Sequence, residues 1–260
     1  MHMTLDYLSN IERQQEILIF LNRQQRISVA EICEMFAVSE ATARRDLEVL
    51  TEQNHLRRVH GGAISLRQAP PELPMLQREM EQAEEKKKIG LAAAHQVQDG
   101  ETVFLGSGST VLEAARILKD RSSLTVITNS LPVMNLLSGL SDISLIALGG
   151  MLRDSELSFI GHITEQALSE IRADKVIIGI HAIDLENGLT NDYLPETMTD
   201  RAILKCGREV IVVADHTKIN SVSIAYLAPV ESIHKFITDQ NAPANFLSSL
   251  AEKGIIVITA

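Results

Sequence analysis

One segment of the chain has the residue types that bind anions. Residues 104–110 read FLGSGST, and we expect them to leave a strand and open a helix. Glycine lets the backbone approach an anion, serine and threonine hydroxyls donate hydrogen bonds, and a helix N-terminus offers free amides and the positive end of its dipole. This composition indicates a phosphate-binding loop, and a plain strand-to-helix turn is an equally good interpretation of the segment alone.

A second group is basic. Arg44 and Arg45 stand in a predicted helix from about residue 39 to 53, and Arg57 and Arg58 follow in a predicted hairpin. Arginine can contact guanine through two bonds or clamp a phosphate, so this cluster suits DNA. The alternative for any one arginine is pairing with a nearby carboxylate on a solvated face.

The elements around these arginines predict a winged helix-turn-helix. Ser28 and Glu31 have the spacing of a capping box, which starts a helix to about Phe36. A three-residue turn ends at Ser39, a good N-cap for the next helix. Two helices so joined place the second in the major groove of DNA. The runs 56–60 and 63–66 flank a double glycine and predict the hairpin.

Within the second helix, Ala43, Leu47 and Leu50 recur at the spacing of one buried face, which leaves its polar residues more exposed. Together with the hairpin they form the predicted DNA-binding set. Its members are Ser39, Glu40, Thr42, Arg44, Arg45, Arg57, Arg58 and His60.

The proline-rich stretch 69–74 can continue neither helix nor strand, so we place a domain linker there. The predicted domains are the winged helix-turn-helix at 1–68, the linker and start of a connecting helix at 69–88, and an effector-sensing domain at 89–260. The charged run 84–88 (EEKKK) fits a solvated helix face.

Beyond the linker, short apolar runs alternate with helical patterns, which predicts a Rossmann-like, mostly parallel α/β sheet covered on both faces. The predicted strands are 102–105, 124–128, 143–148, 175–180, 209–214, 235–238 and 255–259. The predicted helices are 108–119, 130–139, 162–172, 196–206 and 243–253.

Ligands of open parallel sheets bind beyond the carboxyl ends of the strands, so the loops there form the predicted effector site. Lys218 supplies a cation, while Asp184 and Glu196 suit hydrogen bonds with sugar hydroxyls. For each of these two acids, closing a local turn or capping a helix is an equally good interpretation. The full set is Gly106, Ser107, Gly108, Ser109, Thr110, Thr128, Asn129, Ser130, Gly149, Gly150, Arg153, Asp184, Glu196 and Lys218.

The net charge of −10 speaks against general affinity for nucleic acid. Residues 1–67 are nearly neutral, with eight Arg/Lys against nine Asp/Glu, and the acidic excess belongs to the remainder. DNA binding therefore has to come from a local basic cluster.

Other functions lack support in the sequence. No apolar run approaches the ~20 residues of a membrane span. Cys33 and Cys206 lie far apart in apolar helical patterns, so we expect free thiols in a reducing cytoplasm. His181 and His216 are isolated from other potential ligands, and we predict no metal and no cofactor.

Two stretches carry a family resemblance. Residues 39–47 (SEATARRDL) and 56–63 (LRRVHGGA) resemble the signature of DeoR-type bacterial transcriptional regulators, and 12–18 (ERQQEIL) fits their first helix. Ala43 departs from the family pattern, which usually has Ile or Val at this core position.

The resemblance extends to the C-terminus, where the chain looks like the sensor domain of that family, itself similar in fold to ribose-5-phosphate isomerase. It implies a phosphorylated sugar or related metabolite as effector, double-stranded operator DNA as target, and a homo-oligomer (dimer or tetramer). Gly106, where many members have Asp, and His181-Ala182, which replaces a common glycine, are departures that bear on which sugar is accepted.

We therefore predict a sequence-specific DNA-binding repressor of a sugar-metabolism operon, relieved by a phosphorylated sugar. The alternative is a sugar-phosphate isomerase-like enzyme with an accessory DNA-binding module. In the isomerases a lysine and a run of glycines lie where this chain reads GLTNDY at 188–193, with neither. Asp200 could act as a carboxylate base, but the partner lysine is missing, so we predict binding without turnover and no enzyme.

Overall fold

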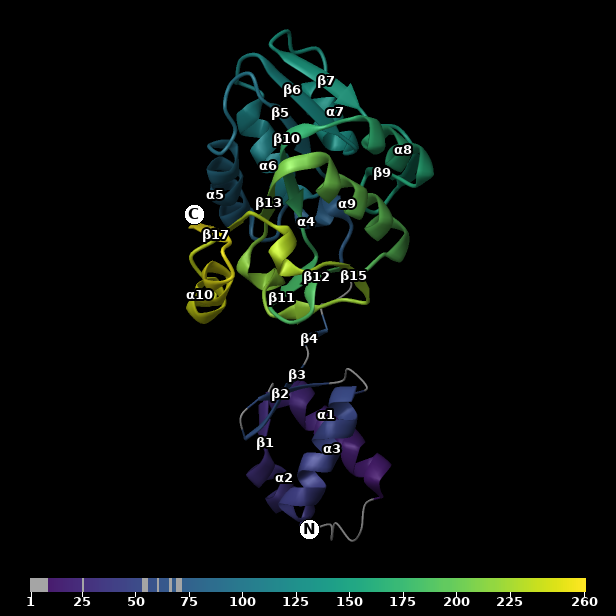
Figure 1. Ribbon diagram of the computed structural model, residues 1–260, viewed down its shortest axis with the longest axis vertical. Helices are drawn as coiled ribbons and strands as arrows, with labels where there is room; N and C mark the ends of the chain where they lie inside the picture. Colours follow the sequence, from purple (N-terminus) through teal and green to yellow (C-terminus); the bar gives the residue numbers. More distant parts are fainter. Residues whose placement is uncertain (1–8, 25, 53–55, 60, 66, 69–71) are drawn as a thin grey trace. The chain divides into compact units, whose positions relative to one another are not determined.

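The computed structural model describes residues 9–24, 26–52, 56–59, 61–65, 67–68 and 72–260 (Figure 1). The chain divides into two compact units, residues 1–68 and 69–260, which we call the reading head and the sensor unit. Each unit is described by itself.

The reading head has the predicted winged helix-turn-helix architecture. Helices α2 and α3 are joined by a tight turn, and strands β2 and β3 form the predicted hairpin, with Val59 paired to Gly62. A strand that the sequence did not predict, β1, pairs with β3, so the sheet order is β1-β3-β2. The elements are α1 (Asn10–Gln24), β1 (Arg26–Ser28), α2 (Val29–Phe36), α3 (Glu40–Glu52), β2 (Leu56–Val59), β3 (Gly62–Ser65) and β4 (Arg67–Gln68).

Local signals in the sequence explain how these elements start and stop. The capping box of α2 is present: the amide of Glu31 donates to Ser28 Oγ at 3.1 Å, and the amide of Ser28 donates to Glu31 Oε2 at 2.7 Å. Ala37 ends α2 in the left-handed conformation, with φ of 52°. Gly62 is required because a Cβ atom there would lie 2.2 Å from the Ile27 carbonyl oxygen.

The sensor unit is built on a seven-stranded, wholly parallel sheet, and all seven predicted strands are in it, within two residues at each end. Its order is β17-β16-β13-β10-β5-β6-β7. The strands are β5 (Thr102–Leu105), β6 (Leu124–Thr128), β7 (Ile143–Ala147), β10 (Ala173–Gly179), β13 (Gly207–Val213), β16 (Lys235–Thr238) and β17 (Ile256–Thr259).

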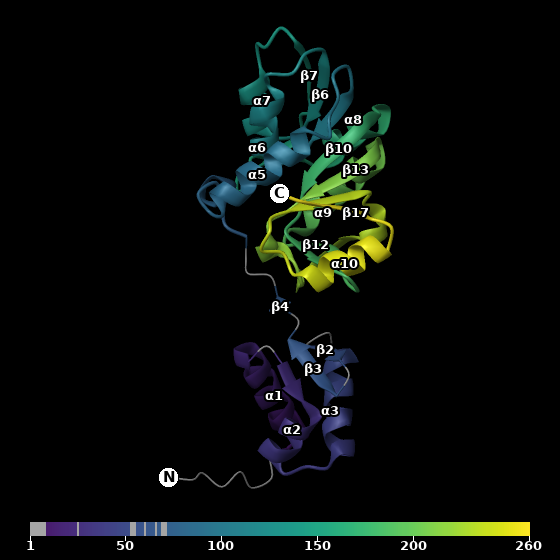
Figure 2. The ribbon, with the colours of Figure 1, turned by 90° about the vertical axis from the view of Figure 1, so that its left-hand side faces the viewer.

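Helices cover both faces of this sheet, as Figure 2 shows. On one face the helices pack on side chains such as Val103 and Leu105, and on the other they pack on Phe104, because successive side chains of a strand alternate. The first group is α5 (Ala83–Ala94), α6 (Ser109–Leu118) and α7 (Leu131–Leu137); the second is α8 (His162–Glu170), α9 (Leu194–Cys206) and α10 (Ala244–Glu252).

Short elements complete the sensor unit. β8 and β9 form a hairpin, and β11, β12 and β15 form a small antiparallel sheet. These strands could not be predicted from the sequence, because runs of three or four residues show no clear periodicity. The short elements are α4 (Met75–Arg78), β8 (Met151–Arg153), β9 (Ser158–Ile160), β11 (Ala182–Asp184), β12 (Gly188–Asn191), β14 (Ser221–Val222), β15 (Ala225–Ala228) and the 3₁₀ turns η1 (His216–Lys218) and η2 (Val230–Ser232).

The strand order contains a switch point. From β5 the chain adds β6 and β7 on one side, and then β10, β13, β16 and β17 on the other. The loops that follow β5 and β10 therefore leave the sheet in opposite directions. A crevice opens at such a point beyond the carboxyl ends of the strands.

Candidate functional site

A cavity of about 620 Å³ lies at the switch point of the sensor unit. The segments that follow β5, β10 and β13 line it, together with residues from the 72–86 segment, from the β8–β9 turn and from α9. Its polar lining residues are Glu72, Arg78, Glu81, Gln82, Lys86, Ser107, Ser109, Thr110, Glu156, His181, Asn191, Asp192, Glu196, Asp200, Asp215, Thr217 and Lys218.

The predicted anion loop lines this cavity. Ser107, Gly108, Ser109 and Thr110 all face it, and Gly108 is the N-cap of α6 with φ of 104°, a conformation that suits glycine. The free amides of the first turn of α6 therefore begin at the cavity wall. Gly106 lies behind the loop, where its amide donates to the Ile177 carbonyl at 2.9 Å.

Three cationic side chains line the cavity. Only Lys218 was predicted; Arg78 and Lys86 are new members of the site. Lys86 is an exception to the solvated face expected for 84–88, since it is buried and its ammonium donates to the Arg78 carbonyl at 2.6 Å. Ile89 and Gly90 are buried on the same face of α5, and this i, i+3, i+4 spacing is the signal in the sequence that could have identified it.

Two of these cations, Arg78 and Lys218, meet carboxylates inside the cavity. Arg78 lies between Glu72, at 2.7 Å, and Glu156, with which it makes a very close ion pair. Lys218 Nζ is 3.4 Å from Glu72 Oε1. Glu72 and Glu156 were not predicted, because one follows the prolines of the expected linker and the other lies in the turn of the missed β8–β9 hairpin.

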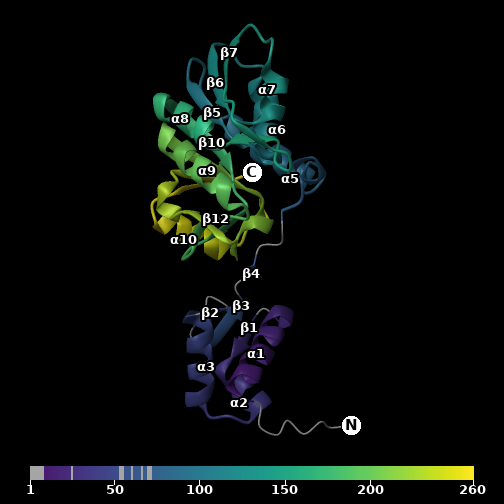
Figure 3. The same cartoon turned by 90° about the vertical axis from the view of Figure 1, so that its right-hand side faces the viewer.

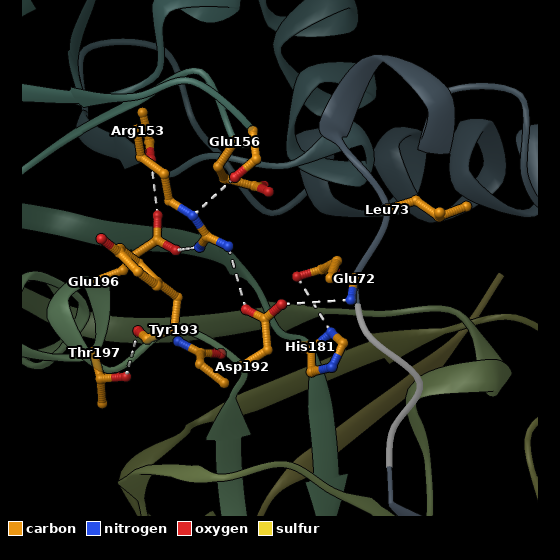
Figure 4. A network of polar contacts seen from close by, with 12 residues as sticks. Glu72, Leu73, Arg153, Glu156, His181, Asp192, Tyr193, Glu196 and Thr197 are labelled. Carbon is orange, nitrogen blue, oxygen red and sulfur yellow. Dashed lines mark hydrogen bonds and ion pairs between the residues drawn. The ribbon is translucent and has the colours of Figure 1, made fainter.

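Arg153 holds a second group of acids at the cavity wall. Its guanidinium makes a close ion pair with Glu196, lies 3.3 Å from Asp192 and stacks over the Tyr193 ring at 4.6 Å (Figure 4). Glu196 also accepts from the Ser158 hydroxyl at 2.8 Å. Of these two predicted effector residues, Glu196 lines the cavity and Arg153 does not, and the Arg153 guanidinium is paired with carboxylates of the protein.

Burial sets the protonation of the acids. It raises the pKa of Glu156 to about 7 against the lowering by Arg78, and it raises the pKa of Glu196 and, strongly, that of Asp200. For Glu72 burial also acts upward, but contact with His181 and the charges of Arg78 and Lys218 prevail and lower the pKa to about 2. The cavity therefore combines the ionised carboxylate of Glu72 with buried acids whose pKa values are shifted upward, toward the neutral form.

His181 lines the cavity, and its two ring nitrogens have no hydrogen-bond partner among the described residues. Its side chain is 3% exposed, and Nδ1 lies 3.2 Å from Glu72 Oε2 without the alignment of a hydrogen bond. Among the described residues, Nε2 has no hydrogen-bond partner. A buried polar atom without a partner is costly, so this nitrogen is available to a ligand.

The remaining predicted effector residues lie away from the cavity lining. Thr128 ends β6. Asn129 and Ser130 follow it and hold the β8–β9 hairpin, for example through the side-chain amide of Asn129, which donates to the Phe159 carbonyl at 3.0 Å. The Gly149 carbonyl accepts from the Thr164 hydroxyl at 2.8 Å, and a Cβ at Gly150 would lie 2.2 Å from that hydroxyl. These loops position the turn that carries Glu156.

Asp184 also lies outside the lining. Its carboxylate accepts from the amides of Glu186 and Asn187 at 3.0 and 2.9 Å, so it closes the turn between β11 and β12. Closing a local turn was the alternative role that the sequence left open for Asp184.

In the reading head, α3 presents its arginines to solvent. Figure 3 shows α3 along one side of the head, next to β2. Ala43, Leu47 and Leu50 are buried as predicted, while Arg44 and Arg45 are exposed. The Ser39 hydroxyl accepts from the Thr42 amide at 3.2 Å and so caps the helix.

Two predicted DNA contacts have partners on the protein. Arg44 lies 3.2 Å from Glu40, and Arg58 lies 3.6 Å from Glu48, both as exposed ion pairs. Such pairs contribute only about 0–1 kcal/mol, so they leave the arginines available. Of Arg57 the structure describes only the backbone, and His60 lies outside the described residues.

Comparison with known proteins agrees with this architecture. Residues 13–69 match the DeoR-like helix-turn-helix domain, and residues 81–240 match the DeoR C-terminal sensor domain. A helix-turn-helix domain joined to a sensor domain defines the class, a transcriptional regulator. The chain belongs to the DeoR family.

Named relatives span nearly the whole chain. The transcriptional repressor AccR of Agrobacterium fabrum is 34% identical, over 94% of this chain and 95% of that protein. The glycerol-3-phosphate regulon repressor of Escherichia coli K12 is 33% identical, over 95% and 98%. The HTH-type transcriptional repressor GlcR of Bacillus subtilis is 34% identical, over 94% of each.

Solved structures give more distant likenesses. Ribose 5-phosphate isomerase A of Methanocaldococcus jannaschii has a TM-score of 0.39 and 20% identity, over 52% of this chain and 53% of that one. eIF2B beta of Chaetomium thermophilum has a TM-score of 0.43 and 17% identity, over 87% and 66%. At these TM-scores neither likeness bears on function.

Two further features are absent from the described residues. No helix there is long and apolar enough to cross a membrane. No three or more His, Cys, Asp or Glu side chains in the described ranges are grouped to hold a metal ion.

Proposed function

We propose that this protein represses a sugar-metabolism operon and that a phosphorylated sugar bound in the sensor cavity releases it from operator DNA. The observation that carries the proposal is the cavity itself: the N-terminus of α6, Arg78, Lys86 and Lys218 meet at the switch point of the sheet. A chain with such a cavity and a helix-turn-helix has both parts of a ligand-controlled regulator.

The lining suits a ligand with one anionic group and several hydroxyls. The amides at the start of α6, the hydroxyls of Ser107, Ser109 and Thr110, and the cations of Arg78 and Lys218 together form the proposed cradle for phosphate. Buried acids such as Glu196 and Asp200, whose pKa values are raised, are suited to hydrogen bonds with sugar hydroxyls. The name of the glycerol-3-phosphate regulon repressor supports the same ligand class, since that compound joins a phosphate to hydroxyls.

We assign binding without turnover to the cavity. Isomerisation needs an ionised base beside the sugar carbon. The candidate base Asp200 is buried, accepts from the Asn191 amide group at 2.6 Å, and has a raised pKa that favours the neutral acid. The regulator names of the relatives support this assignment.

DNA binding is assigned to α3 and the hairpin, with Ser39, Glu40, Thr42, Arg44, Arg45, Arg57, Arg58 and His60 as the proposed contacts. Because the head is nearly neutral, one head gives modest non-specific affinity. A dimer or tetramer that sets two heads on half-sites about one helical turn apart supplies the rest.

The DNA assignment is tested by replacing Arg44 and Arg45 with alanine in the full chain. An operator is first selected from a random duplex library with the wild-type protein, and gel shifts then compare variants. Each base contact is typically worth ~1–3 kcal/mol, so we expect the double variant to lose at least about tenfold in affinity.

The matched control is Arg208→Ala, which removes an exposed arginine of the sensor unit. It should bind the operator like the wild type. Unchanged operator affinity of the Arg44/Arg45 variant would contradict the assignment of α3 as the recognition helix.

A further inference from the structure

A carboxylate of the protein occupies the cationic part of the sensor cavity. Glu72 Oε1 lies 2.7 Å from Arg78 Nη1 and 3.4 Å from Lys218 Nζ, and Oε2 lies 3.2 Å from His181 Nδ1. The Glu72 side chain is 10% exposed. Figure 4 shows Glu72 pointing from the chain toward the His181 ring.

The three groups around this carboxylate come from separate parts of the fold. Arg78 ends α4, His181 follows β10, and Lys218 ends η1. Convergence of donors from separate elements on one anion is how proteins bind the carboxylate or phosphate of a ligand. The firm ionisation of Glu72, with a pKa of about 2, agrees with its placement as such an anion.

An anionic ligand and Glu72 compete for the same groups. Among the described residues, Lys218 makes its ion pair with Glu72, and the other carboxylate paired with Arg78 is Glu156, whose pKa of about 7 allows it to become neutral. A phosphate that enters while Glu72 is in place meets a like charge in a partly desolvated cavity. With Glu72 withdrawn, the same phosphate meets Arg78, Lys218 and His181.

We infer that Glu72 is an internal substitute for the anionic group of the effector and that the effector displaces it. The inference rests on the proposed function, because it takes the effector to be an anion bound in this cavity. Glu72 is four residues beyond Gln68, the last residue of the reading head. Its release therefore removes from the cavity the first described residue that follows the head.

This arrangement makes ligand and linker mutually exclusive occupants of one subsite. For two mutually exclusive occupants, weakening the hold on Glu72 strengthens the apparent affinity for the ligand, up to the affinity of the open cavity, and ligand binding in turn weakens the hold on Glu72. The Glu72 amide adds to the hold, since it donates to Asp192 Oδ2 at 3.4 Å.

The test measures the affinity of the full chain for inorganic phosphate by titration calorimetry. Glu72→Gln removes the internal anion, and we expect it to bind phosphate at least about tenfold more tightly than the wild type. Glu81→Gln is the matched control, since it removes an exposed carboxylate that lines the same cavity, and its gain in affinity should be clearly smaller, no more than about threefold.

Glu72→Asp is a second variant, in case Glu72→Gln fails to fold, and it separates the effect of side-chain length from the effect of charge. It keeps the net charge but is one methylene shorter, so it cannot hold all three partners, and tighter phosphate binding than in the wild type is again expected. Equal or weaker binding by both Glu72 variants, or an equal gain in Glu81→Gln, would overturn the inference and leave the proposed function standing. Absence of phosphate binding in every variant would count against the proposed anion site as well.

Discussion

At the scale of the residue, Asp46 differs from its charged neighbours on α3. It is buried and accepts from Arg13 Nε at 2.6 Å and from the Gln14 side chain at 2.9 Å. It therefore ties the recognition helix to α1 and cannot contact DNA. Removing one partner of a buried pair leaves the other charge uncompensated.

Asp46→Ala should lower the free energy of unfolding of the reading head by ~3–5 kcal/mol because Arg13 stays buried without its partner. Hydrogen exchange of the head amides in the full chain measures this loss. Glu48→Ala is the control: it breaks only the exposed contact with Arg58, so a change of less than ~0.5 kcal/mol is expected. Similar losses in both variants would show that the Arg13–Asp46 pair has no special role.

Glu156 makes the sensor unit sensitive to pH. Its pKa is about 7 in the folded protein against 4.5 for an ordinary glutamate, so the folded state holds the proton more tightly. Stability from this group is complete below pH 4.5, falls as the pH rises, and is lost above pH 7. The full loss is about 3 kcal/mol.

Glu156→Gln keeps the shape of the neutral acid and cannot ionise. Urea unfolding of the sensor unit at pH 5 and pH 7.5 should show that the wild type loses on the order of 2–3 kcal/mol more than the variant between the two values. Parallel pH profiles for the two proteins would contradict the raised pKa.

At the scale of the element, the sequence predicted the sheet well and the cavity only in part. Strands such as β10 and β13 contain continuous apolar runs, at 176–178 and 210–213, because helices cover both their faces, and this pattern is plain in the sequence. The loop at 106–110 could be predicted because glycine, serine and a helix start stand together. Its place at the switch point follows from the strand order, which no local pattern contains.

The residues that were missed depend on tertiary placement. Glu72, which lies among the prolines of 70–74, and Arg78, four residues beyond Pro74, looked like linker. In the structure Pro74 is the N-cap of α4 and the segment lines the cavity. Asp184, predicted for the effector, closes a turn instead of lining the cavity. An acidic side chain has the same appearance in the sequence in either role, because its direction is set by elements distant in the chain.

The α6 loop can be tested as an element. Gly108→Ala places a side chain at φ of 104°, with the new Cβ 3.7 Å from Glu156 Oε1, and such strain costs ~1–3 kcal/mol. Since the loop has to move to relieve it, we expect phosphate affinity to fall by about tenfold. Titration calorimetry with inorganic phosphate measures the change.

Gly139→Ala is the matched control. Gly139 also has a positive φ, of 80°, but no atom lies within 4 Å of the added Cβ, and the residue does not line the cavity. It should lower stability by a similar amount and leave phosphate affinity unchanged. If Gly108→Ala binds phosphate like the wild type, the α6 loop is not the cradle.

At the scale of the whole molecule, a nearly neutral reading head is joined to an acidic sensor unit. The proposed affinity for the operator therefore comes from specific contacts and from the proposed pairing of heads more than from bulk charge. A ligand controls such a protein only if it binds the DNA-bound and free arrangements with different affinity. Displacement of Glu72 supplies that difference, since the carboxylate and the ligand exclude one another.

The proposed control of DNA binding by a phosphorylated sugar is tested most directly by measuring operator affinity in the presence of a panel of sugar phosphates, each paired with its unphosphorylated sugar. We predict that at least one phosphorylated compound lowers operator affinity by tenfold or more, within the ~5–150-fold range usual for allosteric coupling. Its unphosphorylated counterpart should leave the affinity unchanged. An equal effect of the two forms on operator affinity, or no effect of any phosphorylated sugar in the panel, would contradict the proposed function.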